Sequence, residues 1–270
     1  AAADPRTRDD MMTSNHNNKA GRVHGKIALV TGGAKGIGAA SVRVLAAEGA
    51  QVLISDLDVE AGQALAAEIG PAAAFIRHDV SSEDAWRQVI DHVRERYGRL
   101  DILVNNAGIL IAGSIEETSL QAWQKVMRVN ADSVFLGCRE GIALMKGSGG
   151  SIINLSSVAA LAGRDDYLAY SASKGAVAAL SRSVAALCRR RRYRIRCNTL
   201  HPDGVLTDMT RGSLPEGVDP ERMTIDSDPM NRMCRPEDVA ASVLFLASDE
   251  ARAINGVELR IDSGQMVMSI

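Results

Sequence analysis

Aromatic side chains, cysteine motifs and long apolar stretches are scarce or missing in this 270-residue chain. Aromatics make up 3% of the residues while 46% are hydrophobic, so Ala, Val, Leu and Ile must fill the core. No apolar stretch reaches the length of a membrane span, and we expect no membrane contact. No two cysteines have C-x-x-C spacing and no histidine cluster lies near one, which favours free thiols over disulfides or a metal site. The cysteines are Cys138, Cys188, Cys197 and Cys234.

The chain also lacks an excess of charge of one sign and an apolar N-terminal leader. It has 31 basic and 33 acidic residues, a net charge of −2, which gives no general reason to expect a nucleic-acid partner. Residues 1–24 are polar, so we expect a disordered or tag-derived tail, one domain over residues 25–270 and a cytoplasmic location. The arginine run over 189–196 is interpreted as a solvated patch that complements the dipole at the end of a helix.

Short apolar runs alternate with helical periodicity along the chain. Residues 26–30 form an apolar run that ends in a glycine cluster, a helical pattern follows over 36–48, and a second run covers 52–54. Further on, one long helix is predicted over about 120–145 and a last helix over 236–247. This alternation predicts a single α/β domain, in which a doubly wound, Rossmann-like parallel sheet carries helices on both faces.

Glycines cluster between the first predicted strand and the first helix, in the pattern T-G-x-x-x-G-x-G. The backbone of such a turn approaches a pyrophosphate closely, and the N-terminus of the following helix then binds it. Glycine is common in turns, but its place between a buried strand and a helix favours a dinucleotide site. The residues concerned are Gly32, Gly36 and Gly38, with Lys35 and Ile37 beside them.

Asp56 lies just past the end of the second predicted strand and indicates which nicotinamide cofactor is used. Its carboxylate would accept hydrogen bonds from ribose hydroxyls and repel a 2′-phosphate, so it favours NAD over NADP. Lys35 favours the opposite, because a basic side chain there attracts a 2′-phosphate. Asp56 carries more weight because it would lie against the ribose itself, and we predict NAD. A solvated or capping role is the alternative for Asp56.

Tyr170 and Lys174 are four residues apart and therefore share one face of a predicted helix. A free phenol has a pKa of about 10, and a nearby ammonium favours the phenolate and lowers that pKa. The pair is suited to move a proton to or from an alcohol oxygen, although Y-x-x-x-K alone is common by chance. Ser157 ends a central strand and Asn106 follows another, so both are expected where ligands bind to parallel sheets.

These motifs, in this order, resemble the short-chain dehydrogenase/reductase family over about Gly25 to the C-terminus. They are the glycine pattern, Asp79-Val80, N-N-A-G at 105–108, Asn130, Ser157 and Y-x-x-x-K.

The resemblance implies a role for each matching residue. Tyr170 would be the acid/base, Lys174 would lower its pKa and hold the nicotinamide ribose, and Ser157 would hydrogen-bond the substrate oxygen. Asn130 would support a water that links Lys174 to solvent. Residues implied to bind the cofactor are Gly32, Lys35, Gly36, Ile37, Gly38, Asp56, Leu57, Asp79, Val80, Asn106, Ala107, Gly108, Tyr170, Lys174, Pro202, Val205 and Thr207.

Four segments are similar to a narrower group, the bacterial 3β/17β-hydroxysteroid dehydrogenases. These segments are residues 78–83, 133–138, 201–204 and 213–218. Asp203 stands where the wider family commonly has Gly, a departure that this group shares. The resemblance to the group implies a steroid substrate, and that to the family implies a homotetramer.

Residues 206–231 are too long for a plain connector and are interpreted as a substrate lid. Their apolar side chains suit a large apolar pocket, although simple packing of the lid onto the core is a second interpretation. We expect an NAD-dependent dehydrogenase that oxidises a steroid hydroxyl, passing hydride to NAD and a proton to Tyr170. Dehydrogenation of smaller cyclic or terpenoid alcohols and a non-catalytic NAD sensor are the alternatives. The apolar lid residues are Leu206, Met209, Leu214, Val218, Met223, Ile225 and Met230.

Overall fold

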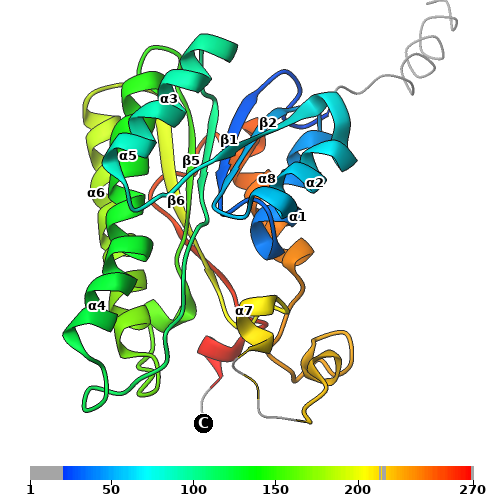
Figure 1. Ribbon diagram of the computed structural model, residues 1–270, viewed down its shortest axis with the longest axis vertical. Coiled ribbons are helices and arrows are strands. Elements are labelled where there is room, and N and C mark those ends of the chain that lie inside the picture. The colour runs from blue at the N-terminus through cyan, green and yellow to red at the C-terminus, as the bar shows by residue number, and fades with distance from the viewer. Residues whose placement is uncertain (1–20, 213, 215–216, 269–270) are drawn as a thin grey trace, which may run out of the picture.

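A single seven-stranded sheet forms the centre of the molecule (Figure 1). The computed structural model describes residues 21–212, 214 and 217–268. The strand order is β3-β2-β1-β4-β5-β6-β7, and every neighbouring pair is parallel. The chain moves outward from β1 to β3, returns to β4 and continues to β7, so the doubly wound, Rossmann-like fold is confirmed.

The inner strands are short and apolar because helices cover both faces of the sheet. Every residue of β1 and β4 is buried, as expected for a parallel sheet with no solvated face. The strands are β1 Ile27–Thr31, β2 Gln51–Asp56, β3 Ala73–Arg77, β4 Ile102–Asn105, β5 Gly150–Leu155, β6 Ile195–Pro202 and β7 Glu258–Ile261.

Helices α1, α2 and α8 pack on one face of the sheet, and α3, α5 and α6 on the other (Figure 1). Asp58 and Ser82 cap α2 and α3 by accepting backbone hydrogen bonds, and Pro236 opens α8. The helices are α1 Gly36–Ala47, α2 Val59–Ile69, α3 Glu83–Tyr97, α4 Leu120–Met127, α5 Ser133–Met145, α6 Leu168–Arg190, α7 Asp208–Arg211 and α8 Pro236–Ala247.

The domain begins earlier than predicted. Val23 is fully buried in the core, and Arg22 pairs with Glu250 at 2.8 Å. The tail predicted over 1–24 is therefore wrong for residues 21–24, because a buried apolar side chain and an ion pair tie them to the domain. Residues 1–20 lie outside the described residues.

The long helix predicted over 120–145 contains a π-helical interruption. Residues 128–132 form a π-helical stretch between α4 and α5, and Asn130 is fully buried within it. Such wider turns are rare and occur often at functional sites. A second, smaller difference is that Asp56 is the last residue of β2 rather than the residue after it.

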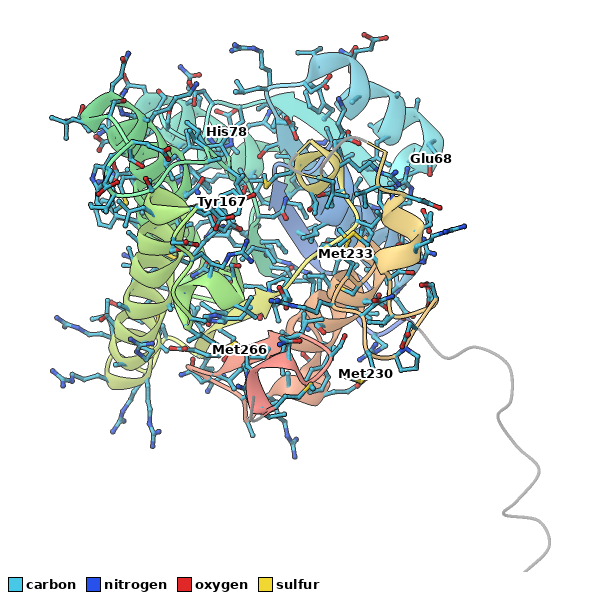
Figure 2. All side chains as sticks on the ribbon, turned by 90° about the horizontal axis from the view of Figure 1, so that it is seen from below. Glu68, His78, Tyr167, Met230, Met233 and Met266 are labelled. Carbon is cyan, nitrogen blue, oxygen red and sulfur yellow. The ribbon has the colours of Figure 1, made fainter. Side chains whose placement is uncertain are left out.

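The carboxyl ends of the strands all point toward α7 and the segment that follows it (Figure 1). Figure 2 looks onto this edge of the sheet, with Met233 lying inward and Met230 at the outer rim. Met233 is 4% exposed and Met230 is 69% exposed, so the two methionines have different surroundings. Helix α7 belongs to the predicted lid, so the start of the lid lies at the edge where ligands bind in open parallel sheets.

Candidate functional site

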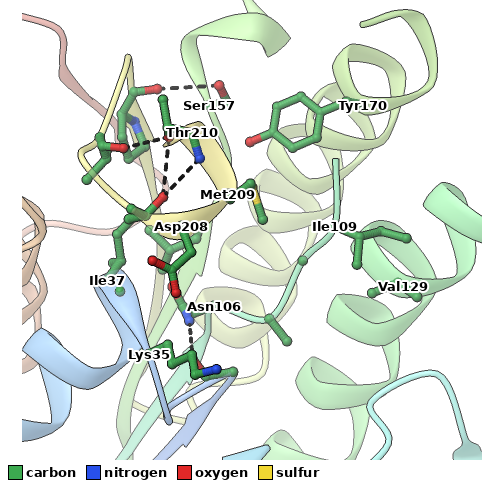
Figure 3. Close-up of a pocket in the computed structure, with 18 of the residues that line it drawn as sticks. Lys35, Ile37, Asn106, Ile109, Val129, Ser157, Tyr170, Asp208, Met209 and Thr210 are labelled. Carbon is green, nitrogen blue, oxygen red and sulfur yellow. Dashed lines mark hydrogen bonds between the residues drawn. The ribbon is translucent and has the colours of Figure 1, made fainter. Parts of the chain in front are cut away.

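A cavity of about 690 Å³ opens at the carboxyl edge of the sheet (Figure 3). Lys35 and Asn106 lie at one end of it, and Ser157 and Tyr170 at the other. Among the residues predicted for the site, Gly38, Asp79 and Asn130 do not line it. Those that do are Gly32, Lys35, Gly36, Ile37, Asp56, Leu57, Val80, Asn106, Ala107, Gly108, Ser157, Tyr170, Lys174, Pro202, Val205 and Thr207.

The glycine turn after β1 is closed by contacts that leave no space for a side chain. Gly32 has φ +60°, and a Cβ there would lie 2.7 Å from the Cα of Ala107. A Cβ on Gly38 would lie 2.0 Å from the carbonyl oxygen of Gly32, so Gly38 lets α1 pack against the turn. The Asn106 amide donates to the carbonyls of Thr31 and Gly32, at 3.0 and 2.9 Å, and ties β4 to the turn. These contacts hold the backbone beside the cavity.

Asp56 and Lys35 have separate partners. Asp56 accepts backbone hydrogen bonds from Ala34 and Asp58, both at 3.0 Å. Lys35 forms an ion pair of 2.7 Å with Asp58, whose carboxylate also caps α2. The Lys35 charge is therefore offset by Asp58, which weakens the argument for a 2′-phosphate.

Ser157, Tyr170 and Lys174 meet at the other end of the cavity. The Tyr170 hydroxyl points into the pocket in the view of Figure 3. Lys174 is 4% exposed; its ammonium lies 5.6 Å from the centre of the Tyr170 ring and donates to the Leu155 carbonyl at 2.8 Å. Two separate segments supply these residues, since Ser157 follows β5 and the other two lie on α6.

Ser157 is held by the backbone around it. Its hydroxyl accepts from the amide of Ala159 at 3.1 Å and donates to the carbonyl of Pro202 at 3.4 Å. His201, which is fully buried, has its Nδ1 3.0 Å from the Ser157 carbonyl oxygen. Burial lowers the pKa of His201, so the ring is neutral and positions Ser157 by hydrogen bonding.

The pKa of Tyr170 differs from the prediction. Burial raises it, because the phenolate loses contact with water, and a hydrogen bond to Ser157 acts in the opposite direction. Burial also lowers the pKa of Lys174 to about 8. The pKa of Tyr170 is therefore raised in the protein chain and not lowered as predicted, because desolvation outweighs the hydrogen bond to Ser157.

Asn130 lies in the π-helical stretch, and its side chain hydrogen-bonds the backbone of a neighbouring segment. Its amide oxygen accepts from the Ile109 amide at 2.8 Å, and its amide nitrogen donates to the Ile109 carbonyl at 2.9 Å and to Ser173 Oγ at 3.1 Å. Gly108 lies between this side chain and Lys174, since an added Cβ would be 3.4 Å from Asn130 Oδ1 and 3.5 Å from Lys174 Nζ. Asn130 thus holds the backbone of Ile109, which lines the cavity, but does not line the cavity itself.

Asp79 turns away from the cavity, and its neighbours take its place. Its carboxylate accepts from the amide and the hydroxyl of Ser81, at 2.9 and 2.7 Å. Val80 and His78 line the cavity instead. His78 is 1% exposed and packs edge-on against Trp86 at 4.6 Å, and burial lowers its pKa to about 4. A contact of the Asp79 side chain with adenine is not supported by this orientation.

The lid rests on the glycine turn. Thr207 caps the short helix α7, and its methyl carbon would lie 3.1 Å from a Cβ on Gly36. Leu206 and Met209 line the cavity. Among the other predicted lid residues, Ile225 packs on the core and Met230 is mostly exposed, so both interpretations of the lid hold for different side chains. Residues 213, 215 and 216 lie outside the described residues.

An ion pair joins Arg232, which directly follows the lid, to Asp203, which directly follows β6. Arg232 donates two hydrogen bonds to Asp203, at 2.8 and 3.0 Å, and the Asp203 side chain is only 9% exposed. Asp203 also lines the cavity, so the unusual residue at this position has a structural role here. Two hydrogen bonds between a guanidinium and a carboxylate restrict the relative orientation of the two side chains and also stabilise their contact.

We expect Arg232→Met to raise KM for the alcohol about 10-fold, because the lid loses this tie, and to leave KM for the cofactor within about twofold. Arg222→Met is the matched control, since Arg222 is on the lid but its side chain is 88% exposed. Steady-state kinetics of the two variants test this. Equal effects from both would mean that the Asp203 pair does not act on the lid.

Sequence reasoning missed several residues that line the cavity. Ile109 follows the N-N-A-G motif directly and Val129 precedes Asn130, so proximity to a motif was the available signal for both. Asp208, Thr210 and Arg211 come from α7, which lies within the predicted lid, but only the apolar residues of the lid were named as candidates. Within the residues described, no helix is long and apolar enough to cross a membrane, and no cluster of metal-ligating side chains is present.

Known proteins with similar sequences or structures cover nearly the whole chain. The family model described as Enoyl-(Acyl carrier protein) reductase matches residues 32–266. The 3-beta-hydroxysteroid dehydrogenase of Comamonas testosteroni is 48% identical over 92% of this chain and 99% of that protein. The NADP-dependent (R)-specific alcohol dehydrogenase of Lentilactobacillus kefiri is 39% identical over 90% of this chain and 97% of that protein. The crystal structure of gox2181 has a TM-score of 0.85 and 32% identity, covering 92% of this chain and 98% of the other.

Proposed function

Since this chain belongs to the short-chain dehydrogenase/reductase family and is an oxidoreductase, we propose that it oxidises a secondary hydroxyl of a steroid or similar polycyclic alcohol with NAD. The observation that carries the proposal is the convergence of Ser157, Tyr170 and Lys174 on one end of the cavity that Asp56 and the glycine turn line at the other. A relative named as a 3-beta-hydroxysteroid dehydrogenase, 48% identical, supports the substrate class.

The residues present fit a nicotinamide dinucleotide. Gly32 and Gly36 of the glycine turn line the cavity without side chains, so a pyrophosphate could approach their backbone at the start of α1. Asp56 has lone pairs left for ribose hydroxyls after accepting two amide hydrogens, and Val80 forms an apolar wall nearby. Bound NAD would supply the hydride acceptor.

The protein's own groups would orient the alcohol and move its proton. Ser157, whose position His201 holds, would donate to the substrate oxygen. Tyr170 would accept the proton of the substrate hydroxyl as hydride leaves the carbon that bears this hydroxyl. The Lys174 ammonium would stabilise the phenolate that this step needs, and its other hydrogen bonds would hold the nicotinamide ribose.

The walls next to Tyr170 favour an apolar substrate. Ile109, Val129, Leu206 and Met209 line the cavity, and Figure 3 shows the first two across from Met209 on the side of Tyr170. A volume of about 690 Å³ is within the range of pockets that enclose ligands of this size together with part of a cofactor. Met209 is 43% exposed and flexible, so it can adapt to a rigid ring system.

Steady-state kinetics with a substrate panel test the proposal. The panel contains steroids with a 3β- or 17β-hydroxyl, cyclohexanol, a terpenoid alcohol and a 3-hydroxyacyl thioester, each with NAD and with NADP. We expect kcat/KM for the steroids to exceed that for cyclohexanol at least about 100-fold, because a larger apolar surface is buried. Turnover confined to small alcohols or to the thioester would contradict the steroid assignment.

We expect Asp56→Ala to lower kcat/KM for NAD about 10- to 100-fold, because charge-assisted hydrogen bonds to the ribose are lost. The preference for NAD over NADP should fall by a similar factor, since repulsion of the 2′-phosphate is removed as well. Asp58→Ala is the informative companion, because it frees Lys35 from its ion pair and should raise the affinity for NADP alone. A wild-type enzyme with higher kcat/KM for NADP would overturn the choice of NAD.

A further inference from the structure

A second cavity, of about 800 Å³, opens at the opposite edge of the sheet. The end of α6, the start of β5 and the turn that leads into β7 surround it. These elements lie at the amino edge, because β6 begins here and runs toward α7 (Figure 1). We call this the amino-edge cavity. Its cationic lining residues are Lys26, Arg189, Arg192, Arg194, Arg196 and Arg252.

Most of this positive charge has no counter-ion. The cavity has two carboxylates, and both are already paired: Asp249 with Lys26 at 2.6 Å and Asp101 with Arg99 at 3.0 Å. Arg196 donates to main-chain carbonyls at the end of α8, the shortest of these bonds being 2.6 Å. In the part of the chain that the structure describes, the other four arginines form no ion pair, and all four are exposed. They are Arg189, Arg192, Arg194 and Arg252.

Two of these arginines have a backbone conformation that disfavours side chains. Arg192 has φ +59° and Arg194 has φ +57°, in the left-handed region that glycine adopts without cost. The turn is ordered by hydrogen bonds, because the Arg192 amide donates to Arg189 and the Arg194 carbonyl accepts from Gly150. The dipole at the end of α6 accounts for cations on its last turn, but Arg192, Arg194 and Arg252 lie beyond that turn. Strained residues of this kind occur where a side chain is needed for a function.

We propose that the amino-edge cavity is an anion site, separate from the cofactor site, for a small ligand that carries several phosphate groups. A guanidinium offers five N–H donors in a planar fork that matches phosphate oxygens, and four arginines without an ion pair line this cavity. The cavity, at about 800 Å³, is of small-molecule size, whereas a nucleic acid would need a basic track along the surface. A compact polyphosphate therefore fits better than a nucleic acid.

Calorimetric titration with sodium tripolyphosphate tests the proposal on the full-length enzyme. Saturating NAD is present throughout, so that the probe cannot bind where the cofactor's pyrophosphate would. We expect one site for the wild type, and an affinity about 10-fold weaker for each of Arg192→Gly and Arg194→Gly, with additive loss in the double variant. The same titration with ATP shows whether a nucleoside raises the affinity above that for tripolyphosphate or leaves it unchanged.

The glycine variants separate binding from folding. Glycine relieves the positive φ at both positions, so thermal unfolding of the double variant should occur at or above the wild-type temperature. Arg191→Ala is the matched control, because Arg191 lies in the same run, is exposed and does not line the cavity, and its affinity should equal that of the wild type. Absence of binding at millimolar tripolyphosphate, equal binding by the double variant, or tighter binding of a duplex oligonucleotide would each overturn the proposal.

Discussion

Replacing Tyr170 by Phe is expected to lower kcat for alcohol oxidation about 1,000-fold while the Kd for NAD stays within about threefold. The loss follows from the proposed reaction, because the Tyr170 phenol lies at the end of the cavity where it would accept the hydroxyl proton, and general-base catalysis contributes about 100- to 10,000-fold. The ring remains, so the packing beside Lys174 is retained. Stopped-flow turnover and fluorescence titration with NAD measure the two quantities.

Tyr167→Phe is the matched control for this variant. Tyr167 lies just before α6, stacks with Arg164 and does not line the cavity, so its hydroxyl should make no difference to kcat. The same experiment separates an enzyme from an NAD-binding sensor. If Tyr170→Phe keeps full activity in a biological assay while its turnover is lost, binding is the function and oxidation is incidental.

Lys174→Met is expected to lower kcat at least about 100-fold and to change how stability depends on pH. Burial lowers the pKa of Lys174 from 10.5 to about 8, so between these values the unfolded chain binds more protons than the folded one. The contribution of Lys174 to the free energy of unfolding should therefore rise as the pH rises from about 8 toward 10.5, and the difference between the wild type and Lys174→Met isolates it. Both proteins share the buried thiols of Cys188, Cys197 and Cys234, whose raised pKa acts in the opposite direction. Below pH 8 the cost of burying the charge is fully present, on the order of 3 kcal/mol at 1.36 kcal/mol per pKa unit.

The Met variant should show no such rise, because the titrating group is gone. Urea unfolding from about pH 7 to about pH 9.5 tests this below the range in which Tyr170 titrates, since burial raises the pKa of that phenol. Loss of a donor to the Leu155 carbonyl offsets part of any gain in stability at neutral pH. Lys125→Met should keep the wild-type dependence of stability on pH, because Lys125 is exposed on α4. If Lys174→Met also kept this dependence, Lys174 would not be desolvated.

Local patterns were enough to predict much of the fold and most of the cavity lining. The glycine turn, Asp56 and the Y-x-x-x-K pair were predicted because each is recognised within a short stretch of sequence. The orientation of Asp79 was not predicted. Its carboxylate can contact solvent, a ligand or the Ser81 amide, and the geometry of the local turn determines which of these it contacts. The π-helical stretch around Asn130 was also missed, because a wider turn leaves the helical periodicity of the sequence nearly unchanged.

By itself the sequence determined the order of strands and helices and the place of the glycine turn, and it predicted Tyr170 and Lys174 as the proton-transfer pair, since each depends on residues close together in the chain. The tertiary structure alone decided which groups face one another across the sheet. It placed Ser157 against His201, Lys35 against Asp58 and Arg232 against Asp203, and it raised the pKa of Tyr170 where the sequence suggested lowering. Burial and long-range pairing depend on how distant segments pack, and no local pattern records them.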